Sequence, residues 1–407
     1  MPVVIQELAA ELLLTAPELA EGMTDHLVAT IPEFSGDDEL RAETRASTEG
    51  NIGQVLRLLK SGSDAEALVV PPEAIELMRG LVRRGITVAA LLRTYRLGHA
   101  WLWDRWSQAL KDRIDEQDEL EAARDVSSAF MFAYVDRVSD ILVEEYGTER
   151  ERVVRGVAQL RADTVRTVLA GDALDEEVAV SRLGYELRRQ HLALRVWSAS
   201  NEIRGLGRAA TEAAGVLGPG EPLIIESGVT TLDVWWGSYD EIDTQALAGY
   251  KPPDGIRLAF GVPGHGVPAF RRSHAEAIQA ARVAALASNA RPVTDYREIE
   301  LVSLLATDLP RARAFVASRL GPLATDEEPA QRLRDTVLAY LSTGGSSTRS
   351  AKELFVHQNT VTYRVKRAEE LLGRRVTQSP VELTCALTLA SVLGSAVLAH
   401  GSGTIAD

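Results

Sequence analysis

The stretch LFVHQNTVTYRVKRAEELLG, residues 354–373, decides how the C-terminal part of the chain folds. Its apolar residues recur at steps of four, three and four, and they are Val361, Val365, Ala368 and Leu372. This period predicts a helix that packs on one side. A shorter predicted helix, SSTRSAKELF (346–355), places the small Ala351 ten positions before Val361. Because a small residue lets a second helix cross closely, the spacing predicts a helix-turn-helix.

The polar side chains of the second predicted helix form a candidate surface for double-stranded DNA. Those that project away from the valines are Gln358, Asn359, Thr360, Thr362, Tyr363 and Lys366. Gln and Asn pair with adenine edges, Lys with guanine, and Thr contacts the thymine methyl group. We expect Arg349, Arg364 and Arg367 to contact phosphates. Either Asn359 or His357 can cap the helix, and a solvated basic face on a helical hairpin is the structural alternative.

The charge of this region contrasts with that of the rest of the chain. Residues 346–376 contain seven basic and three acidic side chains, a local charge of +4, whereas the whole chain has −14. The remainder therefore carries −18. Such a charge argues against a protein that coats nucleic acid or an anionic membrane with its whole surface. The asymmetry indicates a small basic module attached to acidic domains.

Length and composition predict a multidomain cytoplasmic protein. A chain of 407 residues is too long for one compact core. The one cysteine, Cys385, excludes an internal disulfide framework and suits a reducing compartment. The N-terminus lacks the basic leader of a signal peptide, and no apolar run approaches the roughly 20 residues that span a membrane, so no membrane partner is expected. The histidines never fall at ligand spacing, so we expect no metal and no cofactor.

Residues 1–146 read as helices throughout, which predicts an N-terminal helical bundle for sensing or interaction. Start and stop signals and apolar spacing of three and four residues predict helices at 37–62, 71–85, 86–112 and 118–146.

Residues 147–171 are predicted to form a linking helix. Their apolar stripe recurs at steps of four, three, four and four, and it consists of Val153, Val157, Leu160, Thr164 and Val168. A stripe this narrow suits a helix that pairs with its twin in a homodimer, or with a neighbouring domain. Simple continuation of the helical bundle is the alternative.

The period changes at about residue 189 and predicts an α/β domain over residues 172–322. We expect a helix at 202–215 and a later helix that begins at Ser273, with Glu276 completing a capping box. The expected strands are 191–199, 222–227, 231–237 and 256–263. The second and third of these form a hairpin. Gly321 and Pro322 mark a boundary, and residues 323–400 are again helical.

The stretch LFVHQNTVTYRVKRAEELLG, residues 354–373, resembles the C-terminal helix-turn-helix of the PucR/CdaR family of bacterial transcription regulators. The matching positions are Leu354, Phe355, His357, Asn359, Thr360, Val361, Tyr363, Arg364, Leu371, Leu372 and Gly373. The match continues into SPVELTCALTLA, residues 379–390. The resemblance implies a DNA-binding domain over residues 323–400.

Two stretches upstream carry further resemblances. Residues 256–284, IRLAFGVPGHGVPAFRRSHAEAIQAARVA, are similar to the middle domain of that family, a relative of the GGDEF nucleotide-cyclase fold. Residues 91–106, LLRTYRLGHAWLWDRW, resemble the helical N-terminal domain of RsbR-type stressosome proteins. The implied fold is multidomain α and α/β: an N-terminal helical bundle, a degenerate GGDEF-like α/β domain and a C-terminal helix-turn-helix.

Enzymatic activity is not expected of the middle domain. A working cyclase needs carboxylates on the first strand and in the hairpin to hold divalent metals. The first strand, HLALRVWSA, has no carboxylate, and the hairpin turn reads ESGVTT, where Glu226 alone cannot replace the missing acids. The domain is therefore interpreted as an interaction or dimerisation scaffold.

An aromatic group in the predicted helix 86–112 is a possible ligand-sensing site. Tyr95, His99 and Trp106 share one helix face with Leu102. Aromatic stripes at this spacing are usually core, and a small-molecule sensor site is the alternative.

The hypothesis is a cytoplasmic, sequence-specific, DNA-binding transcriptional regulator. Its helical N-terminal domain responds to an unknown small-molecule or protein effector, and its protomers form a homodimer. The alternative is a stressosome-like signalling scaffold in which the N-terminal domain binds protein partners.

Overall fold

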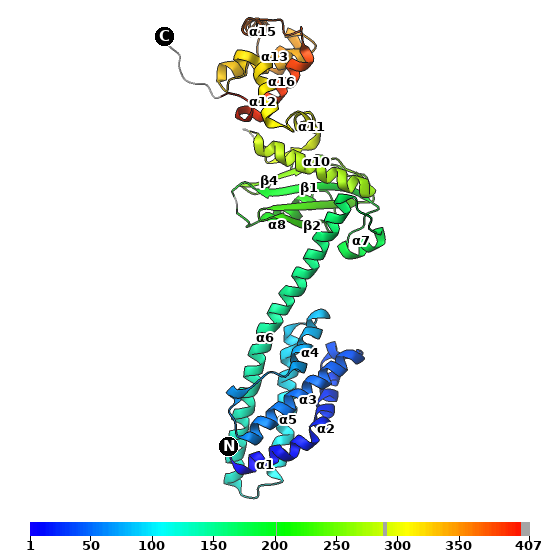
Figure 1. Cartoon of the computed structure of the whole chain (residues 1–407), viewed down its shortest axis with the longest axis vertical. Helices are drawn as coiled ribbons and strands as arrows, with labels where there is room; N and C mark the ends of the chain where they lie inside the picture. Colours follow the sequence, from blue (N-terminus) through cyan, green and yellow to red (C-terminus); the bar gives the residue numbers. More distant parts are fainter. Residues whose placement is uncertain (201, 288–290, 400–407) are drawn as a thin grey trace, which may run out of the picture. The chain divides into compact units, whose positions relative to one another are not determined.

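The computed structural model describes residues 1–200, 202–287 and 291–399 (Figure 1). The chain divides into two compact units, Met1–Gln159 and Leu160–Asp407. The first unit is helical, and the second contains a small mixed sheet followed by further helices. This confirms the predicted multidomain fold, with helical parts before and after an α/β region.

The helices of the first unit enclose one apolar core. They are α1 (Val3–Leu12), α2 (Ala16–Thr30), α3 (Asp38–Ser61), α4 (Pro72–Arg83), α5 (Val88–Lys111) and α6 (Gln117–Ala170), which continues into the second unit. Local signals set the ends of α3: Asp37 Oδ1 accepts a hydrogen bond from Leu40 N at 2.9 Å, and Gly62 ends the helix with a φ of 67°. The predicted helices of this region are therefore confirmed.

Helix α6 runs for 54 residues without a break at the expected start of the linking helix. The sequence contains no proline here, and an interior glycine such as Gly147 costs a helix only about 1 kcal/mol. Within the predicted apolar stripe, Val157 and Leu160 are 50% and 43% exposed, whereas Thr164 and Val168 are buried. The stripe therefore has an exposed half and a half that packs inside the second unit.

The middle of the second unit is a mixed sheet. Its strands are β1 (Gln190–Ser198), β2 (Leu223–Gly228), β3 (Thr231–Ser238), β4 (Ile256–Phe260), β5 (Gly264–His265) and β6 (Val293–Asp295). The order is β2-β3-β1-β4-β6, with β5 paired to β1. Strand β1 is antiparallel to β3 and β4, and β4 is parallel to β6. The predicted hairpin is β2–β3, whereas the three residues of β6 are too few to show a period.

Helices cover both faces of this sheet (Figure 1). They are α7 (Glu176–Leu183), α8 (Leu206–Gly215), α9 (Gln245–Ala248) and α10 (Gly266–Leu286). The alanines of α8 pack on Leu192 and Leu194 of β1. On the opposite face, Phe270 of α10 stacks on Trp235 of β3, with 4.6 Å between the ring centroids. The alternation of side chains along β1 and β3 thus supplies two separate cores.

The expectation that Ser273 caps a helix is wrong. Helix α10 begins at Gly266, so Ser273 lies inside it and is fully buried. Its Oγ accepts a hydrogen bond from Ala193 N of β1 at 2.9 Å. Glu276, expected to complete the cap, accepts a hydrogen bond from Val262 N at 2.7 Å. Both polar side chains therefore connect α10 to neighbouring elements. Their spacing in the sequence matches a capping box, but their contacts are tertiary.

A buried cluster of charged groups joins β1, β3 and α10. Asp233 is 5% exposed and lies opposite Arg195 in the β1–β3 register. The two side chains form a bidentate pair at 2.8 and 2.9 Å, and His274 Nε2 lies 3.0 Å from Asp233 Oδ2. Burial acts to raise the pKa of Asp233, but the hydrogen bonds and charges of His274 and Arg195 outweigh it and lower the pKa to about 2.

The C-terminal helices share one core with the outer side of α10. They are α11 (Tyr296–Leu305), α12 (Leu309–Leu320), α13 (Glu328–Ser342), α14 (Ser347–Glu353), α15 (Gln358–Leu372) and α16 (Pro380–Leu393). Arg334 of α13 is 5% exposed, and its Nη1 donates to the carbonyls of Leu323 and Thr325 at 2.7 and 2.6 Å. A guanidinium thus holds the segment that enters the last four helices.

Asp233→Asn is predicted to lower the free energy of unfolding of this unit by about 2–3 kcal/mol at neutral pH, because Arg195 and His274 lose a buried anionic partner. The folded-state pKa of about 2 lies below the unfolded value, which is about 3.9. The contribution is therefore complete above pH about 4 and lost as the pH falls towards 2. Urea unfolding of the full chain between pH 3 and 7 measures it.

Asp254→Asn, a change at an exposed aspartate before β4, is the matched control and is expected to leave the urea midpoint unchanged. A difference between the wild type and Asp233→Asn that stays constant down to pH 3 would contradict the assignment of this carboxylate.

Candidate nucleic-acid interface

Helices α14 and α15 cross closely at a small residue. Ala351 of α14 is 7% exposed, and the facing Val361, Val365 and Ala368 of α15 are 0%, 8% and 0% exposed. Between the helices, Val356 N donates to Ala351 O at 3.0 Å. The apolar stripe that the sequence predicted is therefore the buried side of α15, and its opposite side faces outward.

The ends of α15 are fixed by His357 and Gly373. His357 Nδ1 accepts a hydrogen bond from Asn359 N at 3.2 Å, which makes His357 the cap and leaves the side chain of Asn359 available. Gly373 ends the helix with a φ of 66°, a conformation that favours glycine.

The outward side of α15 presents most of the residues predicted to contact bases. Gln358, Asn359, Thr362, Tyr363 and Lys366 are all exposed. With about 100° between successive residues, they cover one continuous side opposite the buried valines. Thr348 Oγ1 of α14 donates to Gln358 Oε1 at 3.2 Å, so α14 orients one of these side chains. Five amide, hydroxyl and ammonium groups thus share a surface the width of one helix.

Thr360 and Arg364 lie at the flank of this surface. Both are half-buried, and Arg364 Nη1 lies 3.4 Å from Thr336 Oγ1 of α13. Arg367 is exposed and pairs with Glu370 at 2.9 Å. Arg349 is exposed in the first turn of α14, after the cap Ser346. The three arginines therefore border the polar side of α15 rather than belong to it.

Phe355 in the turn was not among the predicted contact residues. It has a φ of 54°, and among the described residues no other non-glycine residue has a positive φ. Its side chain is 94% exposed and borders a shallow hollow that Lys352 and Gln358 also line. The left-handed conformation costs a non-glycine residue about 1–2 kcal/mol, and no packing offsets that cost here. An aromatic residue at a turn position that favours glycine is the sequence signal that could have revealed it.

The middle domain does not bring together the acids that a nucleotide cyclase needs. Glu226 lies at the end of β2 beside the hairpin turn, and β1 has no carboxylate. Asp233 of β3 is buried and held by Arg195 and His274. Among the described residues, no three His, Cys, Asp or Glu side chains gather in a way that could hold a metal ion. The residues present therefore do not fit the divalent metals of that reaction.

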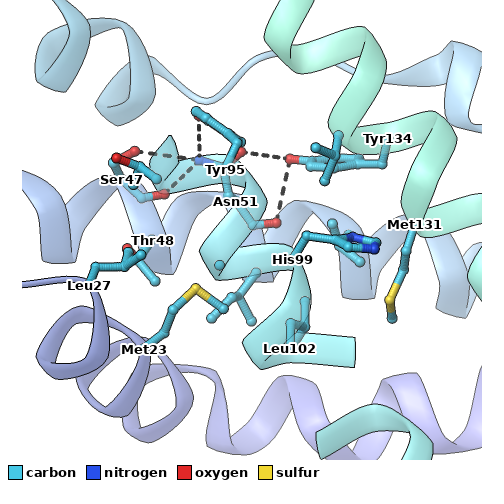
Figure 2. Close-up of a pocket in the computed structure, with 15 residues that line it drawn as sticks. Met23, Leu27, Ser47, Thr48, Asn51, Tyr95, His99, Leu102, Met131 and Tyr134 are labelled. Atoms are coloured by element: carbon cyan, nitrogen blue, oxygen red, sulfur yellow. Dashed lines mark hydrogen bonds between the residues drawn. The ribbon is translucent and has the colours of Figure 1, made fainter. Parts of the chain in front are cut away.

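The aromatic residues predicted as a possible sensing site separate in space. Tyr95 and His99 of α5 line a cavity inside the first unit (Figure 2). Trp106 lies further along α5, fully buried in the core and outside the set of lining residues. The cavity also uses Asn51 of α3 and Tyr134 of α6, which no local pattern connects with α5 (Figure 2).

None of the helices in the described ranges combines the length and the apolarity that a membrane crossing requires.

Three protein-family descriptions match successive parts of the chain. Residues 17–161 match the RsbT co-antagonist protein rsbRD N-terminal domain. Residues 167–283 match the GGDEF-like domain, and residues 333–390 match the PucR C-terminal helix-turn-helix domain. The last match contains the whole of α14, the turn and α15.

Named relatives are similar over parts of the chain. An uncharacterised protein of Thermomonospora curvata is 44% identical over 73 residues, which are 18% of this chain and 39% of that protein. The purine catabolism regulatory protein of Bacillus subtilis (strain 168) is 38% identical over 90 residues, 22% of this chain and 17% of the relative. The transcriptional activator PmfR of Paenarthrobacter nicotinovorans is 31% identical over 109 residues, 27% and 23% of the two chains. The chain thus spans less than half the length of these relatives.

Among solved structures, a regulator of polyketide synthase expression from Bifidobacterium adolescentis aligns with 56% of this chain and 91% of its own, at 22% identity and a TM-score of 0.31.

These matches and the geometry of α14 and α15 confirm the recognition made from the sequence: the chain carries an RsbRD-type N-terminal domain, a GGDEF-like middle domain and a PucR-type C-terminal helix-turn-helix, in that order.

Proposed function

We propose that the chain is a sequence-specific, DNA-binding transcriptional regulator that acts in the cytoplasm. The observation that carries this proposal is the outward side of α15, where Gln358, Asn359, Thr362, Tyr363 and Lys366 are exposed opposite a fully packed apolar side. A helix with this division can enter the major groove while its other side stays in the protein core. The names of the two regulators similar to this chain agree with the proposal.

The contacts divide into two classes by chemistry. Gln358, Asn359 and Lys366 carry the groups that read adenine and guanine edges. Arg349 and Arg367 reach outward beside that surface and suit phosphates. Arg364 and Thr360, half-buried at the flank, would reach the DNA backbone rather than the bases.

The middle domain is proposed to act without chemistry of its own. The buried pairing of Asp233 with Arg195 and His274 supports this proposal, because that carboxylate contributes to packing and is closed to metal and nucleotide. The domain, residues 172–322, would connect the signal-responsive helical part with the DNA-binding part. The proposed boundaries of the other parts are 1–146 for the helical domain, 147–171 for the linking helix and 323–400 for the DNA-binding domain.

A homodimer is proposed because one helix-turn-helix reads only a half-site, and a second copy doubles the contact. Val157 and Leu160 of α6, at 50% and 43% exposure, are the exposed half of the apolar stripe and suit pairing with the same residues of a second chain.

A signalling scaffold is the second candidate, since residues 17–161 match the RsbT co-antagonist domain. Deletion of residues 330–400 separates the two functions. A shortened chain that keeps its effect on the cell's response would favour the scaffold, and one that loses this effect would favour the DNA-binding regulator.

Arg349→Ala is predicted to weaken binding to all DNA sequences and to reduce the slope of log affinity against log salt by about one, because one phosphate contact is lost.

Asn359→Ala is predicted to cost about 1–3 kcal/mol at one base position and to relax preference there. Fluorescence anisotropy on the upstream region of the chain's own gene, over a range of NaCl concentrations, measures both.

Arg208→Ala is the matched control, since Arg208 lies exposed on α8, away from the helix-turn-helix. Absence of salt-sensitive, sequence-selective binding to any genomic fragment would overturn the proposed function.

Phe355→Gly is predicted to raise the free energy of unfolding by about 1 kcal/mol, because it removes the left-handed strain. We propose that the exposed ring of Phe355 also contacts DNA. The same change is therefore predicted to lower DNA affinity about tenfold, or about 1.4 kcal/mol, because this apolar contact is lost. Tyr239→Ala, at another exposed aromatic residue, is the control. Unchanged affinity in Phe355→Gly would show that this phenylalanine does not touch DNA.

Val157→Glu is predicted to raise the dissociation constant of the dimer at least about tenfold, because it buries a charge between paired helices. Sedimentation of the full chain at micromolar concentration measures the effect. Val178→Glu on α7, where the valine is 40% exposed, is the matched control. A wild-type chain that sediments as a monomer would refute the dimer.

A further inference from the structure

The first unit contains a cavity of about 70 Å³ between α2, α3, α5 and α6 (Figure 2). Its walls are mostly apolar, with Met23 and Leu27 from α2, Leu102 from α5 and Met131 from α6. The whole lining comes from residues 23–135, so the cavity belongs to this unit alone.

One end of the cavity is polar. Asn51 Nδ2 donates to Tyr95 Oη at 3.3 Å and to Ser47 O at 2.8 Å, and Tyr134 Oη donates to Asn51 Oδ1 at 2.9 Å (Figure 2). A hydroxyl has one proton to donate and two lone pairs that accept. Since Tyr134 uses its proton on Asn51, its oxygen offers acceptor capacity towards the cavity. This end therefore suits a guest that donates a hydrogen bond.

The lining carries no charged side chain at neutral pH. Burial raises the pKa of Tyr95 to about 12 and raises the pKa of Tyr134 as well. Burial lowers the pKa of His99, so this imidazole is neutral. A charged guest would lose its hydration here without gaining an ionic partner, which costs several kcal/mol. The chemistry selects a neutral guest.

The space depends on Gly98, inside helix α5. A Cβ at this position would lie 3.2 Å from Met23 Sδ, so a side chain here would project into the cavity. Glycine in the interior of a helix costs about 1 kcal/mol relative to alanine. Close packing against Met23 favours glycine here despite this penalty, and the same position borders the cavity.

We propose that this cavity binds a small, neutral, mostly apolar molecule with one hydrogen-bond donor, about the size of a single aromatic ring. An apolar cavity of about 150 Å³ holds benzene. Met23 and Met131 line the cavity, and methionine side chains are flexible and repack readily, so their movement enlarges the cavity to hold a ring. The inference deepens the signal-responsive part of the proposed function, but binding itself requires no DNA.

Phenol is the probe, because it combines a ring with one donor. The chain contains four methionines, so a full-length sample labelled in the methionine methyl groups gives a simple NMR spectrum. Phenol is expected to shift the Met23 and Met131 resonances in a saturable way and to leave Met1 and Met78 unchanged. Benzene, which lacks the donor, is expected to bind roughly tenfold more weakly, and benzoate is expected not to bind.

Gly98→Leu is expected to weaken phenol binding at least about tenfold by filling the space. Gly147→Leu is the matched control, since no other part of the described structure lies within 4 Å of a Cβ there, and it is expected to bind as the wild type does. If Gly98→Leu fails to fold, Gly98→Ala provides the smaller change and is expected to weaken binding about threefold.

Phenol that leaves Met23 and Met131 unshifted up to its solubility would overturn the proposal. So would a Gly98→Leu protein that folds and binds phenol with wild-type affinity. Equal binding of benzene and phenol would refute the part of the proposal that assigns a donor. No DNA is present in these titrations, so their failure is distinct from failure of the DNA-binding proposal.

Discussion

The burial of one narrow apolar stripe constrains the whole candidate interface. Val361, Val365 and Ala368 must face α13, α14 and the core, and Ala351 must stay small for α15 to approach. A rigid helix has only one rotation that satisfies these contacts. That rotation also determines which polar side chains point outward, so the surface for DNA is a consequence of core packing.

In the middle domain, buried polar groups fix the position of a helix, as the apolar stripe does for α15. Ser273 and Asp233 are buried, and each connects an element of the sheet with another part of the domain. Paired in this way they fix the position of α10 on the sheet, since a misplaced helix would leave them without partners. The domain thus has a layered architecture, with helices on both faces of its sheet, and its buried acid serves packing.

Predictions from sequence were right where the signal is local. The caps of α3, the hairpin β2–β3 and the buried side of α15 depend on residues within a few positions of one another. They failed where tertiary contacts decide. Ser273 matches a capping pattern but bonds to a residue 80 positions away. The cavity joins Asn51 and Tyr134, which are 83 positions apart, so no periodicity could assemble it.

The apolar core that the C-terminal helices share bears on how a signal could travel. Hinges form where few interactions resist rotation, and glycine and proline at residues 321 and 322 would ordinarily mark such a place. Here, α12 before this point and α16 after it share one apolar core, so bending would expose the fully buried Leu320 and Leu393. The connection at residues 321–322 is therefore stiff. Movement of the segment before it would displace the last four helices together, as one rigid body.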